Sequence, residues 1–157
     1  MNHQTSPKMP FPPPLLYIGG FGIGWLIARI WPLDIVSDNF RVVGEVLGWI
    51  LIVAGLLIMI IGLYSFAIAR TSIMPNLTAA RLITTGPYRF SRNPMYAGWT
   101  VAYIGCILLT NFIWCIFTLA IVLVVFDKII IPREEEYLKA KFGESYPRYC
   151  KQVRRWL

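Results

Sequence analysis

Four long apolar runs, separated by polar segments, set the pattern of this chain. They extend from about Leu15 to Pro32, Val42 to Ala69, Pro94 to Leu109 and Phe112 to Ile131. Each approaches the roughly 20 residues that a helix needs to cross the hydrocarbon core of a bilayer. The pattern therefore predicts an all-α integral membrane protein with four transmembrane helices, the second of them long enough to tilt or to project beyond the bilayer.

Local motifs predict how these helices meet. Gly20 and Gly24 lie four residues apart on one face of the first helix, where small residues let a neighbouring helix approach closely, within one chain or between two copies. Oligomeric state is thus open. Thr110 and Asn111 provide the turn between the third and fourth helices, which are expected to form a tight hairpin. The glycine-rich run of the first helix follows no strand, which excludes a dinucleotide-binding loop.

Composition and charge agree with residence in a membrane. Of 157 residues, 57% are hydrophobic and 15% are charged, whereas a soluble domain carries about 25% charged residues. The net charge of +7 does not indicate a nucleic-acid partner, because the basic residues flank the apolar runs. Of the 15 lysines and arginines, all except Arg29 and Arg41 fall on one side of the four-helix topology, which predicts that both chain ends are cytosolic.

Three regions follow from this reading. Residues 1–14 are a proline-rich cytosolic lead-in, 15–69 are two N-terminal transmembrane helices, and 70–157 hold the expected catalytic region. From Pro132 onward the chain is charged, and its aromatic spacing predicts an amphipathic helix that lies on the membrane or folds back on the bundle. No metal site is expected, because His3 is the only histidine and the three cysteines form no C-x-x-C pair.

Candidate chemistry gathers where the third apolar run begins. Asn93 and Pro94 are typical of a helix N-cap followed by proline at the first helical position. Arg89 and Arg92 precede them, beside the free N–H groups of the helix, which favours an anion site. The acidic run Arg133-Glu134-Glu135-Glu136 follows the fourth helix, and the hairpin should bring it close to those arginines. Together they would suit a zwitterion; the alternative is a set of topology signals and surface salt bridges.

Two motifs carry a family resemblance. The first is Gly86-Pro87-Tyr88-Arg89 followed by Ser91-Arg92-Asn93-Pro94-Met95-Tyr96-Ala97-Gly98. The second is Glu134-Glu135 with Leu138, Phe142-Gly143, Tyr146, Tyr149 and Val153. In order and spacing they resemble the isoprenylcysteine carboxyl methyltransferase and phospholipid methyltransferase superfamily. The likeness covers about Thr71 to Leu157, while residues 1–70 match only in being two hydrophobic spans.

This resemblance implies an integral membrane methyltransferase that uses S-adenosylmethionine and receives a lipid, prenylated or otherwise lipophilic acceptor from the bilayer. By the same resemblance Arg92 and Glu135, with Arg89, are the catalytic candidates. The residues implied to bind the cofactor are Tyr88, Arg92, Asn93, Pro94, Tyr96, Gly98, Glu134 and Glu135. Carboxylates would favour its ammonium and sulfonium, and arginine its carboxylate. No general base can be named from the sequence.

The acceptor stays open at this point. Asn93 stands where the eukaryotic prenylcysteine enzymes have histidine, so phospholipid amines, thiols and other lipophilic acids are candidates beside an isoprenylcysteine carboxylate. Two other readings compete. Sterol reductases have a similar C-terminal region and use a reduced nicotinamide cofactor, but they have many more spans. A non-enzymatic membrane scaffold or lipid-binding module is the third reading.

Overall fold

The computed structural model describes residues 12–35, 37–69 and 81–156. The expected lead-in over 1–14 lies almost wholly outside the described residues, and so does the stretch 70–80 of the polar connection, Arg70 included. Within the described ranges the chain is helical and forms no strand. The elements in order are α1 (Pro14–Ile30), η1 (Asp38–Phe40), α2 (Arg41–Ile68), η2 (Gly86–Arg89), α3 (Pro94–Thr110), α4 (Trp114–Val125), η3 (Phe126–Ile130), α5 (Ile131–Phe142) and α6 (Ser145–Gln152).

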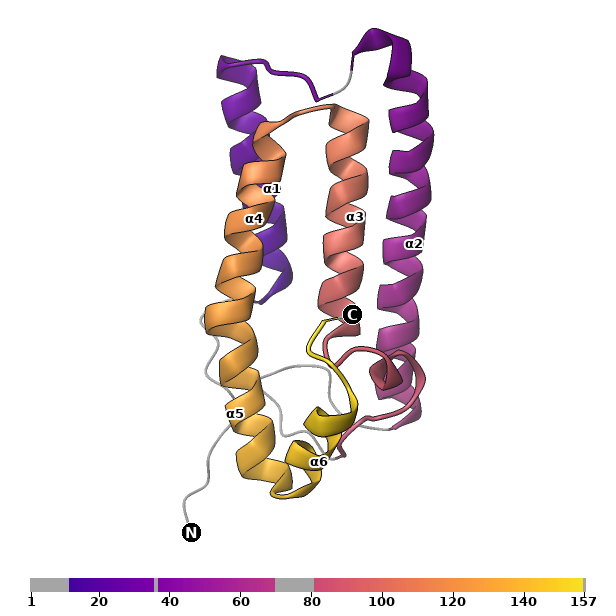
Figure 1. Ribbon diagram of the computed structural model, residues 1–157, viewed down its shortest axis with the longest axis vertical. Helices are drawn as coiled ribbons and strands as arrows, with labels where there is room; N and C mark the ends of the chain where they lie inside the picture. The colour runs from indigo at the N-terminus through magenta and orange to yellow at the C-terminus, as the bar shows by residue number, and fades with distance from the viewer. Residues whose placement is uncertain (1–11, 36, 70–80, 157) are drawn as a thin grey trace.

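Two helices are long and apolar enough to cross a membrane. One is α2, and the other is the continuous rod Trp114–Phe142, which comprises α4, the π-helical turn η3 and α5 (Figure 1). The apolar helices α1 and α3 are shorter, at 17 residues each. Pro132 was expected to end the fourth helix, but the rod runs through it. The π-helical turn just before Pro132 accommodates the proline, which has no backbone N–H to donate, so the helix continues without a break.

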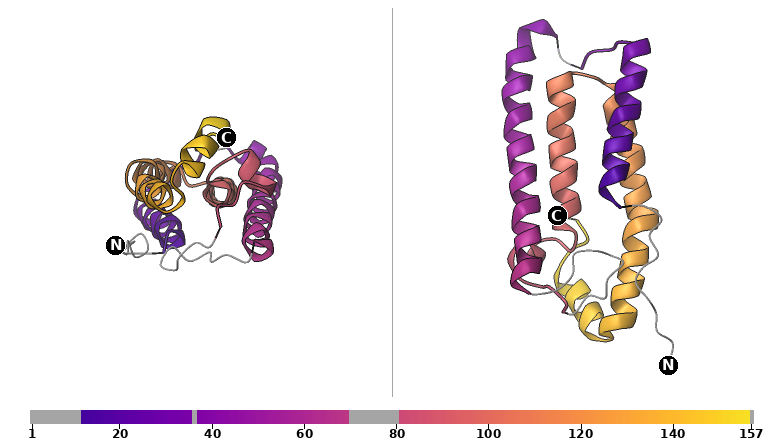
Figure 2. Two further views of the ribbon diagram at one scale, coloured as in Figure 1. Left: turned by 90° about the horizontal axis from the view of Figure 1, so that it is seen from below. Right: turned by 180° about the vertical axis from the view of Figure 1, so that it is seen from behind.

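Glycines bring α2 and α3 into backbone contact. A Cβ added to Gly55 would lie 2.5 Å from the carbonyl oxygen of Gly98, and one added to Gly105 would lie 2.6 Å from that of Gly48. No side chain fits at such distances. The four glycines therefore let these two helices pack along their whole shared length, as the front and rear views show (Figures 1 and 2).

The other half of the bundle pairs α1 with α4. A Cβ on Gly20 would meet Val122 at 2.6 Å, and one on Gly24 would meet Cys115 at 2.9 Å. The predicted glycine face thus packs within the chain. Beside it, the fully buried ring of Tyr17 lies 4.8 Å from that of Phe126, centroid to centroid. The Tyr17 hydroxyl is 2.9 Å from Thr100 Oγ1, which ties α1 to α3.

The turn between α3 and α4 lies where the sequence predicted it. Asn111 ends α3 in the left-handed conformation, with φ of 61°, and its side-chain oxygen accepts a hydrogen bond from Ile35 N at 3.1 Å. The two helices do not form a tightly packed hairpin below this turn. Instead α3 packs chiefly on α2, and α4 packs chiefly on α1, because those are the pairs that the glycines allow to approach.

The C-terminal region also differs from the expectation of one helix. Gly143, with φ of 52°, ends α5, and α6 folds back toward the start of α3 (Figure 1). The aromatic spacing serves this reversal: Tyr146 and Tyr149 are buried on α6 and pack against Leu138 and Phe142 of α5. The fold-back carries the last described residues to the beginning of α3, where the candidate site lies.

The glycine contacts give a direct stability prediction. We expect Gly55→Ala to lower the free energy of unfolding by about 1–3 kcal/mol, because the added methyl overlaps the backbone of Gly98 and Ala102. The matched control is Gly22→Ala on α1, where an added Cβ meets nothing within 4 Å. It should be neutral or stabilising by up to about 1 kcal/mol, since alanine favours helix. Unfolding of both variants in detergent measures the difference, and equal stability would contradict the close packing.

Candidate functional site

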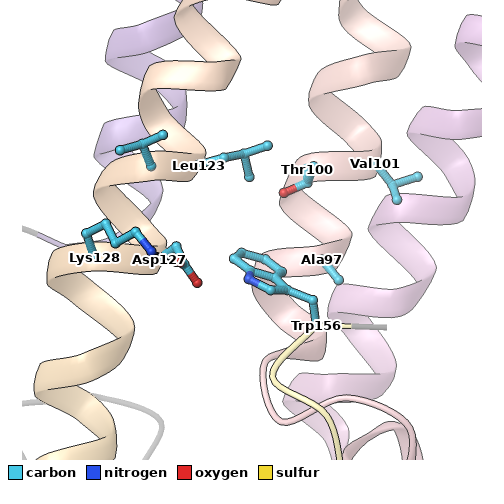
Figure 3. Close-up of a pocket in the computed structure, with 8 residues that line it drawn as sticks. Ala97, Thr100, Val101, Leu123, Asp127, Lys128 and Trp156 are labelled. Carbon is cyan, nitrogen blue, oxygen red and sulfur yellow. Dashed lines mark ion pairs between the residues drawn. The ribbon is translucent and has the colours of Figure 1, made fainter.

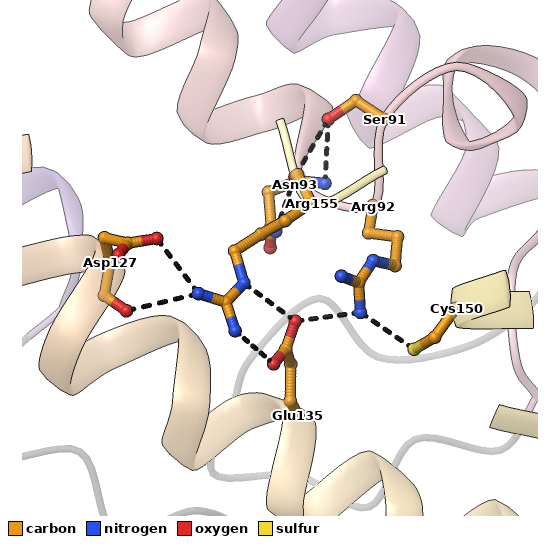
Figure 4. Close-up of polar contacts among 7 residues, drawn as sticks. All are labelled: Ser91, Arg92, Asn93, Asp127, Glu135, Cys150 and Arg155. Atoms are coloured by element: carbon orange, nitrogen blue, oxygen red, sulfur yellow. Dashed lines mark hydrogen bonds and ion pairs between the residues drawn. The ribbon is translucent and has the colours of Figure 1, made fainter. Parts of the chain in front are cut away.

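Four charged side chains from three parts of the chain meet beside the first turn of α3; we call them the ion-pair cluster (Figure 4). They are Arg92 before α3, Asp127 in η3, Glu135 in α5 and Arg155 after α6. Glu135 is the centre, because its Oε1 lies 2.9 Å from Arg92 Nη1 and its Oε2 lies 2.8 Å from Arg155 Nη2. One carboxylate thus holds two guanidinium groups.

Arg92 is the cluster member with spare hydrogen-bonding capacity. Its side chain is 15% exposed, and Nη1 also donates to Cys150 Sγ at 2.8 Å. The Nε atom is buried without a hydrogen-bond partner, the one buried side-chain nitrogen or oxygen in this state among residues 12–35, 37–69 and 81–156. A buried unpaired donor costs free energy, about 1–3 kcal/mol or more for a charged group. The geometry therefore marks Arg92 as a place where an acceptor group can bind.

Arg155 spans the cluster from the other side. Its guanidinium donates to both oxygens of Glu135, at 3.1 and 2.8 Å, and to Asp127 Oδ1 at 3.0 Å. The hydrogen bonds to Glu135 raise the pKa of Arg155 above its usual range; partial burial opposes them, and the bond to Asp127 adds to them. Arg155 therefore stays charged and joins η3 to α5.

Backbone groups fix the segment that carries Arg155. Arg92 N donates to the carbonyl of Arg154 at 2.9 Å, and the carbonyl of Arg155 accepts from Ser91 Oγ at 3.3 Å and Asn93 Nδ2 at 3.0 Å. Asn93 does mark the start of α3, as predicted, but its side chain makes no capping bond to the helix. Its Nδ2 instead donates to the carbonyl of Arg155 and so holds the C-terminal segment.

Tyrosines connect the remaining predicted residues. Tyr96, in the first turn of α3, donates to Glu134 Oε1 at 2.5 Å. Tyr149 donates to the carbonyl of Tyr88 at 2.7 Å, so η2 is held against α6. Burial raises the pKa of the Tyr149 hydroxyl to about 12, while the nearby Arg92 charge acts in the opposite direction. The Tyr149 hydroxyl therefore stays protonated and serves as a hydrogen-bond donor at neutral pH.

The structure brings together five of the predicted site residues: Arg92, Asn93, Tyr96, Glu134 and Glu135. Three others have evident positions in the fold, since Tyr88 is buried in η2, Pro94 opens α3, and Gly98 packs on α2. Arg89 ends η2 with an exposed side chain, outside the ion-pair cluster. Its catalytic role stays a prediction.

Sequence reasoning missed Ser91, Asp127, Arg155 and Trp156. Asp127 is a lone acid within the last apolar run, which is itself an unusual position for a charge. Arg155 is one of several basic residues near the C-terminal end of the sequence, and nothing beside it marks it as a site residue. Asp127 pairs with its neighbour Lys128, but its bond to Arg155, like the bond between Arg155 and Glu135, forms only when α6 folds back.

A groove lies next to the cluster, between α3 and α4 (Figure 3). Its volume is about 580 Å³. Most of the wall is apolar, and the charged groups lie at the end near the cluster, where Asp127 pairs with Lys128 at 2.9 Å. The lining residues are Ala97, Thr100, Val101, Leu123, Val124, Asp127, Lys128 and Trp156. This arrangement suits an amphiphile whose polar end points toward the ion pairs.

Comparison with known proteins gives the family. Residues 43–145 match the model of the phospholipid methyltransferase family, which is well over half of the chain. The chain belongs to that family. The matched region contains nearly all of α2, the whole of α3 and α4, and most of the ion-pair cluster, whereas Arg155 and Trp156 lie beyond it. Membership of the phospholipid methyltransferase family, together with the apolar helices, supports a membrane methyltransferase and implies a methyl donor.

Two relatives are similar over shorter stretches. The protein-S-isoprenylcysteine O-methyltransferase B of Arabidopsis thaliana is 38% identical over 74 residues, 46% of this chain and 37% of its own. An uncharacterized protein of Haemophilus influenzae is 51% identical over 37 residues, 24% of this chain and 59% of its own. The chain thus matches less than two thirds of the length of either relative.

The contacts of Arg155 predict a local effect of its removal. Arg155→Ala breaks the ion pairs to Asp127 and Glu135, and we expect it to lower the free energy of unfolding by about 1–2 kcal/mol, since Arg155 is partly exposed. It should also make residues 153–156 sensitive to carboxypeptidase. The control is Arg154→Ala, whose exposed side chain is removed while its carbonyl still accepts from Arg92. Equal protection of both variants would contradict the anchoring role.

Proposed function

We propose that this protein transfers a methyl group from S-adenosylmethionine to a lipophilic acceptor at a membrane surface. The observation that carries the proposal is the buried, unpartnered Nε of Arg92, which lies next to Glu135 within the region that matches the phospholipid methyltransferase family. S-adenosylmethionine would supply an activated methyl group, and the protein supplies alignment and a site poor in water.

The residues present fit the cofactor. Its methionine part carries a carboxylate and an ammonium, and its sulfonium is cationic. Arg92 can bind the carboxylate through the unpaired Nε, a charge-assisted hydrogen bond that removes the cost of the buried donor. Both oxygens of Glu135 are already held by Arg92 and Arg155, so its role is to orient the two arginines. Glu134, oriented by Tyr96, is assigned to the cationic groups.

The acceptor is assigned to the groove between α3 and α4. Its apolar wall suits a hydrocarbon chain, and its polar end lies beside Asp127, which belongs to the ion-pair cluster. The resemblance to an isoprenylcysteine O-methyltransferase favours a carboxylate acceptor, while the family as a whole also favours phospholipid amines. A carboxylate or thiolate acceptor needs no general base, whereas an amine or a hydroxyl would have to lose a proton.

We also propose four membrane crossings with both chain ends in the cytosol. At 1.5 Å per residue the 17-residue helices α1 and α3 are about 26 Å long, close to the thickness of the hydrocarbon core, and they lie beside the two longer apolar helices. The excess of lysine and arginine on the side of the cluster supports a cytosolic site. Residues 70–157 would then form the catalytic region.

The assignment of Arg92 predicts a loss of cofactor binding. Arg92→Lys keeps the charge but removes Nε, so we expect the Kd for S-adenosylmethionine to rise by about tenfold or more; Glu134→Gln should have a similar effect. Isothermal titration in detergent measures both. Arg148→Lys and Glu136→Gln are matched controls, because both side chains are exposed outside the cluster, and neither should change the Kd.

Other outcomes separate the competing functions. Protection from thermal unfolding by NADPH rather than S-adenosylmethionine would favour a reductase, and no binding of either would favour a scaffold. Membranes incubated with radiolabelled S-adenosylmethionine then identify the acceptor class, since label in lipid, in protein or in a small molecule distinguishes the candidates.

The topology predicts opposite accessibility for two exposed positions. In a chain without native cysteines, Asn39→Cys should be unreactive toward an impermeant maleimide added from the cytosolic side of inverted vesicles, and Lys151→Cys should react. Detergent should then expose Asn39→Cys as a control for its reactivity. Equal labelling of both positions in sealed vesicles would contradict the proposed crossings.

A further inference from the structure

Trp156 occupies an unusual place between the groove and the ion-pair cluster. Its indole projects from the C-terminal segment into the space between α3 and α4, at the level of Ala97 and Asp127 (Figure 3). The ring is partly buried and packs against the core cluster that contains Tyr17 and Phe126. A large aromatic group thus lines the groove at the end that faces the charges.

The position of the indole is fixed by its neighbour. Arg155 is bound through its side chain to Asp127 and Glu135, and through its carbonyl to Ser91 and Asn93. Because these contacts come from η3, α5 and the start of α3, they restrain the backbone that carries Trp156. Packing against the core cluster then holds the ring against one side of the groove, where it acts as a wall.

The indole of Trp156 lies between the apolar part of the groove and the ion-pair cluster. Val101 and Leu123 line the apolar part of the groove, about one helical turn farther from the cluster than Ala97 and Asp127. The ion-pair cluster adjoins that level through Asp127, which lines the groove, and through Arg155, the residue before Trp156. A molecule with its hydrocarbon chain along Val101 and Leu123 and its polar end directed toward Asp127 therefore meets the indole.

We infer that Trp156 is a specificity-determining residue, which limits the bulk of the acceptor head group that reaches the ion-pair cluster. The occupant of the groove is the hydrocarbon chain of the methyl acceptor, so this inference rests on the proposed function. The indole passes small head groups and obstructs branched ones. Replacing it by a smaller side chain widens the passage while the groove that holds the chain is kept.

Two acceptors with the same farnesyl chain test the inference. Farnesylthiopropionate has a small head, and N-acetyl-S-farnesylcysteine has a branched one. Trp156→Ala should raise the ratio of kcat/KM for the branched over the small head by about tenfold, the scale on which apolar pockets discriminate added groups. Trp156→Phe should lie between the wild type and Trp156→Ala. Trp49→Ala, which removes a 61%-exposed indole on α2, is the matched control and should leave the ratio unchanged.

A binding measurement without cofactor separates this inference from the proposed function. A farnesylthiopropionate bearing a diazirine in its chain should label Val101 and Leu123 in the full-length wild type, and labelling should shift toward Ala97 and Asp127 in Trp156→Ala. An unchanged label pattern in Trp156→Ala, or label on the outer face of α2 alone, would overturn the inference. Methyl transfer to neither thioether, combined with the shifted label, would count against the carboxylate acceptor and leave Trp156 as the wall of the groove.

Discussion

The site depends on one carboxylate that holds two arginines. Glu135 bonds Arg92, which precedes α3, and Arg155, which follows α6, so a single side chain of α5 joins two segments more than 60 positions apart. Its charge allows two guanidinium groups to lie together in a partly buried place, where alone they would repel. This contact aligns α5 and holds α6 in its folded-back position. It thereby also helps to form one wall of the groove.

The bundle beneath this site consists of two tightly packed halves that leave a groove between them. Glycines bring the backbone of α2 onto α3, and α1 onto α4, whereas α3 and α4 meet through side chains, among them the buried Tyr103–Thr118 hydrogen bond, and through the turn at Asn111. Because the glycines draw backbones together within each pair and not between α3 and α4, space for a groove remains there. The same glycine pattern that stabilises the fold thus also creates the space assigned to the acceptor.

Much of this was predictable from the sequence, for identifiable reasons. Apolar run length predicted the helices, Asn93-Pro94 the start of α3, and Asn111 the turn before α4, since each signal is local. The meeting of Arg92 and Tyr96 with the Glu134-Glu135 pair followed from helix order. The partners of Asp127 and Arg155, and the diversion of the Asn93 amide from capping, could not be predicted. They depend on the reversal at Gly143, where one residue with positive φ decides which distant segments touch.

The π-helical turn Phe126–Ile130 joins the part of the long rod that lines the groove to the part that carries the acidic residues of the site. A π turn takes up one residue more than an α turn, and one residue corresponds to about 100° of rotation around a helix axis. The side chains of α4 that line the groove and the acids of α5 that face Arg92 are therefore held at a relative phase that an uninterrupted α-helix would not give. Winding the same residues as ordinary α-helix would preserve both helices and their composition, yet it would rotate Glu134 and Glu135 by nearly 100° away from their partners. The π turn thus sets the rotation of α5 relative to α4 about their common axis. For this reason the number of residues between Leu123 and Glu135 is as much a part of the site as the residues themselves.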